Sequence, residues 1–440
     1  MRTFTFKGLF LTAVFMLLGC LSIQAADDDL ITKQITIKLD EAGTLPDRIA
    51  SSRKYKITNL KIVGEINGTD LRRICDMAGY DYYSGHTEGN LSVLDLSEAK
   101  IVSGGKAYYG YFDSYKGENK FYYTYKDEIG DYAFYACRKL TSLTLPSNLT
   151  KIGENAFKNC SGLTSINLPA GITEIGGSAF YGCSGLTSLN LPAGITDINY
   201  SAFEGCTGLT SVTLPSSLDW IGDKAFRGCT GLTSLNLPSS LTAIDKNAFE
   251  GCSGLTSVTL PSSLNRIGDD AFFGCNALKE VRFCINDDLE TYLTKGHPYI
   301  KVDCGINYYL NGKEVTSIVI PSSVTSLGNY AFQKCSTLQS VYVSWSTPIS
   351  AGKAFDEFDT SKCTLYVPQG TEQDYWLAVV WGDFGNIVEF DATGIDKTTT
   401  STDIEEVSRY SVNGQRLVGP TKGLNIVKYS NGSVKKVAVE

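Results

Sequence analysis

One pattern of apolar and polar residues dominates the middle of the chain and returns every 23 positions. Two apolar residue types mark the interval: phenylalanine and, three residues later, cysteine. They stand at Phe134, Phe157, Phe180, Phe203, Phe226, Phe249 and Phe272, and at Cys137, Cys160, Cys183, Cys206, Cys229, Cys252 and Cys275. Chance does not produce such spacing, so this region is built from one repeated structural unit.

Each unit contains a short strand pattern followed by a second apolar stretch. Residues 163–168 follow Leu-x-x-Ile-x-Leu, in which Ile166 and Leu168 share one face because side chains alternate along a strand. Pro169 ends the strand, and Ile172 begins the second stretch. One unit cannot bury these residues alone, so neighbouring units must stack. The pattern predicts a β-rich leucine-rich-repeat solenoid, with a parallel sheet on one face and short helices or turns on the other.

We expect this solenoid to span residues 57–392, because less regular copies of the strand pattern flank the strict repeats. Insertions interrupt it at 103–128 and 284–313. A solenoid also needs covers over its terminal apolar faces. We place an N-terminal cap at 26–56 and a C-terminal cap from about residue 361. The aromatic residues expected inside the C-terminal cap are Tyr366, Tyr375, Trp376, Trp381 and Phe384.

One short helix is predicted near the N-terminal cap, from Thr69 to Met77. Thr69 is the expected N-cap, whose hydroxyl would accept a backbone N–H of the first turn. Leu71, Ile74 and Met77 recur at helical spacing and should face inward.

Residues 1–25 have the pattern of a signal peptide, because Arg2 and Lys7 precede an apolar run too short to span a bilayer. Cleavage after Ala25 competes with lipid attachment at Cys20, which ends the sequence Leu-Leu-Gly-Cys. We favour cleavage, since Leu18 is a poor residue before a lipobox glycine. Either route predicts an exported protein, at the cell surface in association with the outer membrane or secreted.

The C-terminal end departs from the repeat. Residues 393–404 are rich in Thr, Ser and Asp and are a predicted linker. In residues 405–440, Asn413-Gly414 and Asn431-Gly432 each lie between apolar segments, which is typical of β-hairpin turns. We expect a small all-β domain there.

The net charge of −8 and a pI near 5.1 argue against a nucleic-acid partner, because phosphate binding needs clustered Lys and Arg. After the signal segment no stretch has the ~20 apolar residues that a membrane helix needs. Membrane association would therefore depend on a lipid anchor or on secretion machinery. We expect a monomer without cofactors.

No catalytic machinery is evident. Histidine is the common general base, and the chain has only His86 and His297, neither within Gly-x-Ser-x-Gly or His-Glu-x-x-His. Cys-x-x-Cys is also missing from the sequence, so a metal site is not expected. We predict that the protein is not an enzyme. An Asp and Glu pair of the glycosidase type stays open as an alternative, since its members need not be adjacent.

The chain has 13 cysteines. The seven periodic ones stand at a core position and are predicted to be buried thiols. A ladder of disulfides between stacked units is the alternative, because neighbouring strands are close enough for a bridge. Cys284 and Cys304 flank an insertion and form a separate candidate pair.

These residues resemble a known family, the BspA-like bacterial leucine-rich-repeat surface proteins. Its unit, Ala-Phe-x-x-Cys-x-x-Leu-x-x-Val-x-Leu-Pro-x-x-Leu-x-x-Ile-Gly, is matched at residues 202–222. The tail, with Val412-Asn-Gly-Gln-Arg416, is similar to C-terminal domains of exported Bacteroidetes proteins, some of which are type IX sorting signals. The resemblance implies an adhesin-like role in binding extracellular-matrix or plasma proteins and other bacteria.

Two surfaces are candidate binding sites. The first is the aromatic insertion, which includes Phe112 and Phe121 and has as candidate ligand contacts Tyr108, Tyr109, Tyr111, Tyr115, Tyr122 and Tyr123. The second is the solvent face of the strands, where small polar residues repeat at Ser165, Asn167, Ser188, Asn190, Ser211, Ser234 and Asn236. The alternatives are an aromatic hairpin packed on the first units and a polar face that only keeps the sheet soluble.

The sequence as a whole predicts a non-enzymatic surface or secreted protein that binds host or bacterial macromolecules on its repeat platform. A glycan-binding or purely structural surface protein is the alternative.

Overall fold

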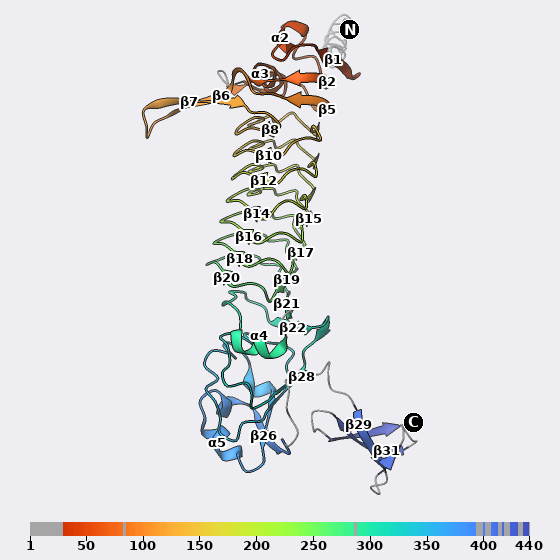
Figure 1. Cartoon of the computed structure of the whole chain (residues 1–440), viewed down its shortest axis with the longest axis vertical. Coiled ribbons are helices and arrows are strands. Elements are labelled where there is room, and N and C mark those ends of the chain that lie inside the picture. The colour runs from red at the N-terminus through yellow and green to blue at the C-terminus, as the bar shows by residue number, and fades with distance from the viewer. Residues whose placement is uncertain are drawn as a thin grey trace, which may run out of the picture. The chain divides into compact units, whose positions relative to one another are not determined.

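The computed structural model describes residues 30–81, 85–285 and 288–392, and five strand segments of the tail. Two compact units divide the chain. Unit 1 holds residues up to Ile195 with Asn199–Thr213, and unit 2 holds Thr196–Ile198 with Leu214–Glu440. Each unit is built from stacked coils of the repeat (Figure 1).

In unit 1 a parallel sheet follows one wall of the coils, in the order β1-β2-β5-β9-β11. Its strands are Ile35–Leu39, Asn59–Ile66, Val93–Ile101, Ser142–Thr144 and Ser165–Asn167. A further parallel pair joins β13 (Ser188–Asn190) and β15 (Ser211–Thr213). The opposite wall carries β8 (Glu128–Ile129), β10 (Lys151–Ile152) and β12 (Glu174–Ile175), also parallel.

The remaining elements of unit 1 belong to its N-terminal part. They are α2 (Leu45–Arg48), α3 (Gly68–Met77), β3 (Tyr80–Asp81), β4 (Gly85–His86), β6 (Gly104–Asp113) and β7 (Glu118–Thr124).

Unit 2 repeats the two walls. One holds β14 (Asp197–Ile198), β16 (Trp220–Ile221), β18 (Ala243–Ile244) and β20 (Arg266–Ile267). The other holds β17 (Ser234–Asn236), β19 (Ser257–Pro261), β21 (Glu280–Ile285) and β22 (Ile306–Leu310), with β23 (Lys313–Glu314) antiparallel at its edge. A third sheet is formed by β24 (Ser317–Ile320), β25 (Ser340–Val343), β26 (Thr364–Pro368) and β27 (Asn386–Phe390), with β28 (Thr399–Thr400).

Helices α4 (Leu289–Lys295) and α5 (Glu372–Leu377), with the 3-10 turns η1 (Thr360–Lys362) and η2 (Trp381–Asp383), complete the repeat region of unit 2. The tail is an antiparallel sheet of β29 (Glu406–Ser411), β30 (Arg416–Leu417), β31 (Gly423–Tyr429) and β32 (Val434–Val439). The two Asn-Gly turns expected there lie outside the described residues, as does the whole signal segment with Cys20.

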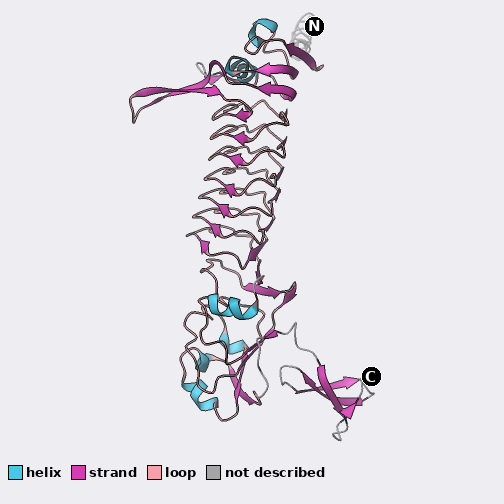
Figure 2. Cartoon of the chain, in the orientation of Figure 1, coloured by secondary structure: helices cyan, strands magenta, loops and turns pink. Residues whose placement is uncertain are grey.

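The parallel ladders confirm the predicted solenoid. Between residues 128 and 285 the wall opposite the sheet is made of turns and two-residue strands, and the helices lie elsewhere (Figure 2). Of the short helices or turns expected on this wall, the structure has turns. The reason is a left-handed residue in every coil, such as Asn155 at φ 56° or Ser178 at φ 54°, because a left-handed residue ends a helix.

Phenylalanine rings form a column inside the coils. In unit 1 the centroids of Phe134, Phe157, Phe180 and Phe203 follow one another at 5.3, 5.1 and 5.4 Å, with planes within 15° of parallel. In unit 2, Phe249 lies 5.4 Å from Phe226 and 5.3 Å from Phe272. Each such contact contributes ~0.5–1.5 kcal/mol beyond the burial of apolar area. The column therefore holds coil to coil as well as filling the core.

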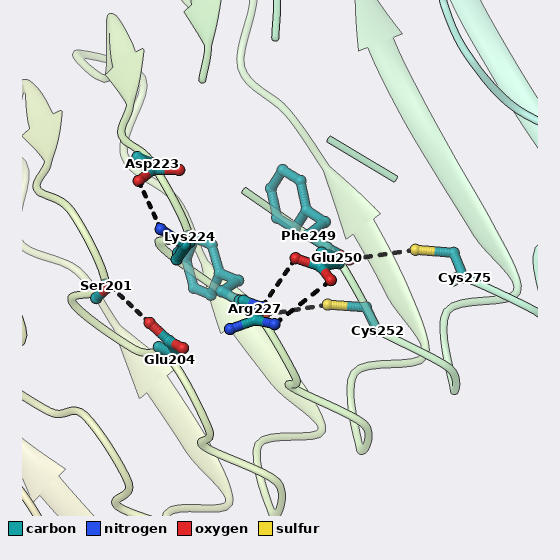
Figure 3. A network of polar contacts seen from close by, with 10 residues as sticks. Ser201, Glu204, Asp223, Lys224, Arg227, Phe249, Glu250, Cys252 and Cys275 are labelled. Carbon is teal, nitrogen blue, oxygen red and sulfur yellow. Dashed lines mark hydrogen bonds and ion pairs between the residues drawn. The ribbon is translucent and has the colours of Figure 1, made fainter. Parts of the chain in front are cut away.

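The periodic cysteines are free, mostly fully buried thiols, which confirms the buried-thiol prediction and not the disulfide ladder. Five of these thiols donate to the carbonyl oxygen of the phenylalanine in the preceding coil, namely those of Cys160, Cys183, Cys206, Cys252 and Cys275. The Cys160 sulfur lies 2.9 Å from the Phe134 oxygen. The same contact from Cys275 to the Phe249 oxygen, at 3.3 Å, is drawn in Figure 3. Burial raises the pKa of Cys206 to about 12 and that of Cys275 to about 11, so these sulfurs stay protonated.

Helix α3 is where expected, with Leu71, Ile74 and Met77 buried, but its N-cap is Asn67 and not Thr69. The Asn67 side chain accepts the Thr69 N–H at 2.9 Å, and the Asp70 carboxylate accepts the Asn67 N–H at 2.9 Å. The Thr69 hydroxyl does not cap the helix, because it accepts a hydrogen bond from the Lys106 N–H at 2.9 Å. The true cap thus lies two residues earlier.

In the C-terminal cap, Tyr375, Trp381 and Phe384 are buried as expected, and Tyr366 stacks on Tyr342 at 4.2 Å. Trp376 is 63% exposed, so its prediction as a core residue is wrong. Adjacent residues of a helix point about 100° apart, and Tyr375 takes the inward position by donating its hydroxyl to the Trp345 oxygen at 2.8 Å.

His297 is buried in unit 2 against Phe283, with ring centroids 4.4 Å apart. Its Nδ1 lies 2.8 Å from the Pro298 carbonyl oxygen, which can only accept, so Nδ1 carries the hydrogen. Nε2 lies 2.9 Å from the Tyr308 hydroxyl, which is also within hydrogen-bond distance of the Gln333 carbonyl oxygen, at 3.0 Å. Burial lowers the pKa of His297 to about 4. This histidine is a neutral core residue.

We predict that acid destabilises the protein through His297. The unfolded histidine binds a proton near pH 6.5 and the folded one only near pH 4. The free energy of unfolding should therefore fall as pH drops from about 6.5 through 4, by up to ~3 kcal/mol. Urea midpoints across this range should be flatter in His297→Gln, whereas His86→Gln, at an exposed histidine, should keep the wild-type slope. Equal slopes in all three proteins would contradict the assignment.

Substitutions at two glycines of unit 1 test whether the close spacing of the coils requires a residue without a Cβ. A Cβ on Gly185 would lie 2.6 Å from the Ser161 carbonyl oxygen of the preceding coil, so Gly185→Ala should force the coils apart. Gly205, at φ 74°, has only ordinary contacts, and Asn159 fills the equivalent position at φ 64°. We expect losses of ~2–3 kcal/mol for Gly185→Ala, about 1 kcal/mol for Gly205→Ala and less for Gly205→Asn. Denaturant unfolding measures all three, and a reversed order would refute the explanation.

Candidate functional site

The aromatic insertion of unit 1 forms an antiparallel hairpin from β6 and β7. Tyr109 pairs with Tyr122, Gly110 with Phe121, and further out Asp113 with Glu118. At the turn the Gly117 N–H donates to the Asp113 carbonyl oxygen at 2.7 Å, and the Asp113 carboxylate accepts the N–H groups of Tyr115 and Lys116. The hairpin extends sideways from the coils of its unit (Figure 1).

A cluster of tyrosines holds the base of the hairpin. Tyr109 stacks face to face on Tyr132 of the adjoining coil, with centroids 4.4 Å apart and planes 3° from parallel. Tyr122 also contacts Tyr132, at 4.9 Å. Tyr80, Tyr111 and Tyr135 complete the cluster. Burial raises the pKa of Tyr132 to about 12, so the phenol stays neutral. The base is therefore a rigid, uncharged support.

Tyr108 does not belong to the surface that the sequence predicted. It is 3% exposed, and its hydroxyl donates to the Asp131 carbonyl oxygen at 2.8 Å. Burial raises its pKa far above the ordinary value for tyrosine. Its assignment as a ligand contact is corrected: Tyr108 anchors the hairpin to the coil.

The two faces of the hairpin differ. Residues directly opposite in an antiparallel pair share a face, so Tyr109, Tyr111 and Tyr122 lie on the face that meets the tyrosine cluster. Phe112 and Phe121 lie on the other face and are 61% and 48% exposed. Tyr123, Tyr125 and the turn residue Tyr115 are also exposed. We name Phe112, Phe121, Tyr123 and Tyr125 the aromatic face.

Of the tyrosines predicted to contact a ligand, Tyr115 and Tyr123 are therefore exposed, and Tyr111 is 37% exposed. Tyr109 and Tyr122 are half-buried in the base. Phe112 and Phe121 were not among the candidate contacts. The alternation of side chains along β6 and β7 is the signal that could have separated the two faces.

The polar residues of the second candidate surface lie where the sequence places them. Ser165, Asn167, Ser188, Asn190 and Ser211 are exposed on unit 1, and Ser234 and Asn236 on unit 2. The register stacks Ser188 on Ser211 and Ser234 on Ser257, so like side chains form rows. The rows are uncharged, and their contact with a ligand stays a prediction.

Cys284 and Cys304 are free thiols, contrary to the predicted disulfide. Cys284 pairs with Tyr309 in the parallel ladder of β21 and β22. Cys304 lies outside this ladder, two residues before β22 begins at Ile306. Neither thiol is bonded to the other.

A polar pocket of about 410 Å³ lies beside α3. Within it, Asp76 accepts from Lys54 Nζ at 2.7 Å and from the Tyr55 hydroxyl at 2.7 Å. Throughout the described part of the chain, no three or more His, Cys, Asp or Glu side chains are grouped to hold a metal ion. Among the same residues, no helix has the length and apolarity to cross a membrane.

Comparison with solved structures gives several leucine-rich-repeat proteins. A leucine-rich-repeat protein of T. pallidum is 35% identical, with 34% of this chain and 71% of that one covered and a TM-score of 0.32. A leucine-rich cell surface protein of Faecalibacterium prausnitzii is 25% identical over 61% and 84% of the two chains, with a TM-score of 0.34. One from Bacteroides ovatus is 22% identical over 60% and 82%, with a TM-score of 0.28. No curated protein matches the chain in sequence.

The family comparison covers more than half of the sequence. The model of the BspA type leucine rich repeat region matches six times, over residues 127–218, 174–296 and 305–373. These ranges include the phenylalanine column, the thiol contacts and the two-residue strands β8 to β20 described above. The chain therefore belongs to the BspA-type leucine-rich-repeat family.

Proposed function

We propose that this chain is a non-enzymatic, exported protein that binds other macromolecules at the cell surface or after secretion, and that the aromatic face of the β6–β7 hairpin makes the principal contact. The observation that supports this best is the exposure of Phe112 and Phe121 on a hairpin whose base is rigid. Large aromatic side chains on a pre-ordered support bind with little loss of conformational entropy.

A protein ligand fits this surface better than a charged polymer. The aromatic face is apolar, and the single ion pair resolved within the hairpin joins Lys120 to Asp113 at 3.3 Å on the opposite face. Interfaces of this composition derive most of their affinity from a few buried aromatic anchors. An adhesin-like role toward host or bacterial proteins follows, with export depending on the signal segment.

A glycan ligand is the second candidate, because the rows of Ser and Asn offer repeated hydroxyl and amide groups at the strand spacing of ~4.8 Å. The mature chain should be tested against a panel of purified extracellular-matrix and plasma proteins and, in parallel, against a glycan array. Binding to glycans alone would indicate that the rows of Ser and Asn are the binding site. Binding to neither proteins nor glycans would indicate that the protein has a structural role.

We predict that Phe112→Ser combined with Phe121→Ser lowers affinity for a protein ligand found in that screen at least tenfold, by surface plasmon resonance. Truncation of a central aromatic anchor costs ~2 kcal/mol or more in binding. The melting temperature should hardly change, because both side chains are largely exposed.

Trp376→Ser is the matched control, since Trp376 is a similarly exposed aromatic residue outside the hairpin. It should leave affinity unchanged. Tyr109→Ser should instead lower the melting temperature, because Tyr109 belongs to the packed base. Equal loss of affinity in Trp376→Ser and in the hairpin variant would place binding elsewhere.

A further inference from the structure

Helix α3 is seated directly on the first regular coil of unit 1. The Cys75 thiol at its inner face donates to the Ala133 carbonyl oxygen at 3.0 Å. Just beyond the helix end, the Ala78 carbonyl oxygen accepts the Lys139 N–H at 3.3 Å. These two contacts bracket Cys137, which lies between Ala133 and Lys139 in the coil.

Cys137 differs from the other cysteines at its repeat position. Cys160, Cys183 and Cys206 donate to the carbonyl oxygen of a phenylalanine one coil earlier. No such coil precedes Cys137, and its thiol is in side-chain hydrogen-bond contact with the thiol of Cys75. Both residues belong to the core, at 0% and 6% exposure. Two buried thiols thus lie next to each other where the helix meets the coil.

We propose that Cys75 and Cys137 form a disulfide when the chain folds in an oxidising compartment, joining α3 covalently to the first regular coil. Closing the bond requires the sulfurs to approach to ~2.05 Å. The segment that the bond would close contains the whole β6–β7 hairpin. The cross-link would therefore close a covalent loop that contains the element carrying the aromatic face.

The reaction needs an oxidant with a disulfide of its own, such as oxidised glutathione or a thiol–disulfide oxidoreductase. One thiol loses its proton and attacks a sulfur of the oxidant, giving a mixed disulfide. The second thiolate displaces the oxidant, which leaves as two thiols, while the protein loses two protons and two electrons. Burial raises the pKa of the Cys137 thiol in the folded state, so the bond should form before this contact is fully buried.

Peptide mapping tests the proposal on the full chain. The protein is refolded with reduced and oxidised glutathione, denatured, alkylated and digested with trypsin. Cleavage at Lys and Arg releases residues 74–100 and 127–138, each with a single cysteine. The expected product is these two peptides joined, two hydrogens lighter than their sum and separated by reduction. Recovery of both as alkylated thiols, or of Cys137 bonded elsewhere, would overturn the proposal.

Cys160 is the matched control, because it holds the same repeat position but contacts a backbone oxygen. It should be recovered alkylated, in the tryptic peptide 159–224. The oxidised protein should also melt several degrees above the same protein in reductant. That difference should vanish in Cys75→Ala and persist in Cys160→Ala. The wild-type comparison needs no variant, so a variant that fails to fold leaves the test intact.

Discussion

The structure depends on like residues stacking on like at an interval of 23 positions. Phe180 contacts Phe157 and Phe203, and the Cys183 thiol reaches back to the Phe157 oxygen, so side chain and backbone hold each coil to its neighbour. Glycine is needed where backbones meet, as at Gly208, where a Cβ would lie 2.5 Å from the Ser184 oxygen. Interior packing and coil spacing are thus set by the same few residues of each unit.

Most of the stacking of the coils could be predicted from the sequence, because the residues that make each contact recur in every unit. The alternation around Ile166 and the spacing of Phe180 and Cys183 suffice to indicate strand, interior and stacking. Single contacts were harder. Whether Thr69 or Asn67 caps α3 depends on the Lys106 N–H, which is distant in sequence. Tyr375 and Trp376 are adjacent aromatic residues, and their inward and outward positions depend on the Trp345 oxygen.

The candidate site shows the same division. Aromatic density alone is enough to locate the hairpin, but it does not separate the tyrosines of its two faces. Tyr109 and Tyr122 pack on Tyr132, whereas the adjoining residues Gly110 and Phe121 form the opposite face. A side chain of the regular coil therefore supports the irregular insertion. Tyr132 is also a left-handed residue of its coil, at φ 60°, so one position serves both the repeat and the hairpin.

The interchangeability of the coils has a further consequence for how such a chain can change over evolution. Within the strict repeats, each coil presents the same groups to the next, so a duplicated or deleted whole unit would recreate the contacts already present. Insertions of other lengths would offset the phenylalanine column and strand ladders together. The number of units can therefore change while the hairpin and both caps keep their own neighbours. The length of the repeat region can evolve without altering the residues of the contact surface.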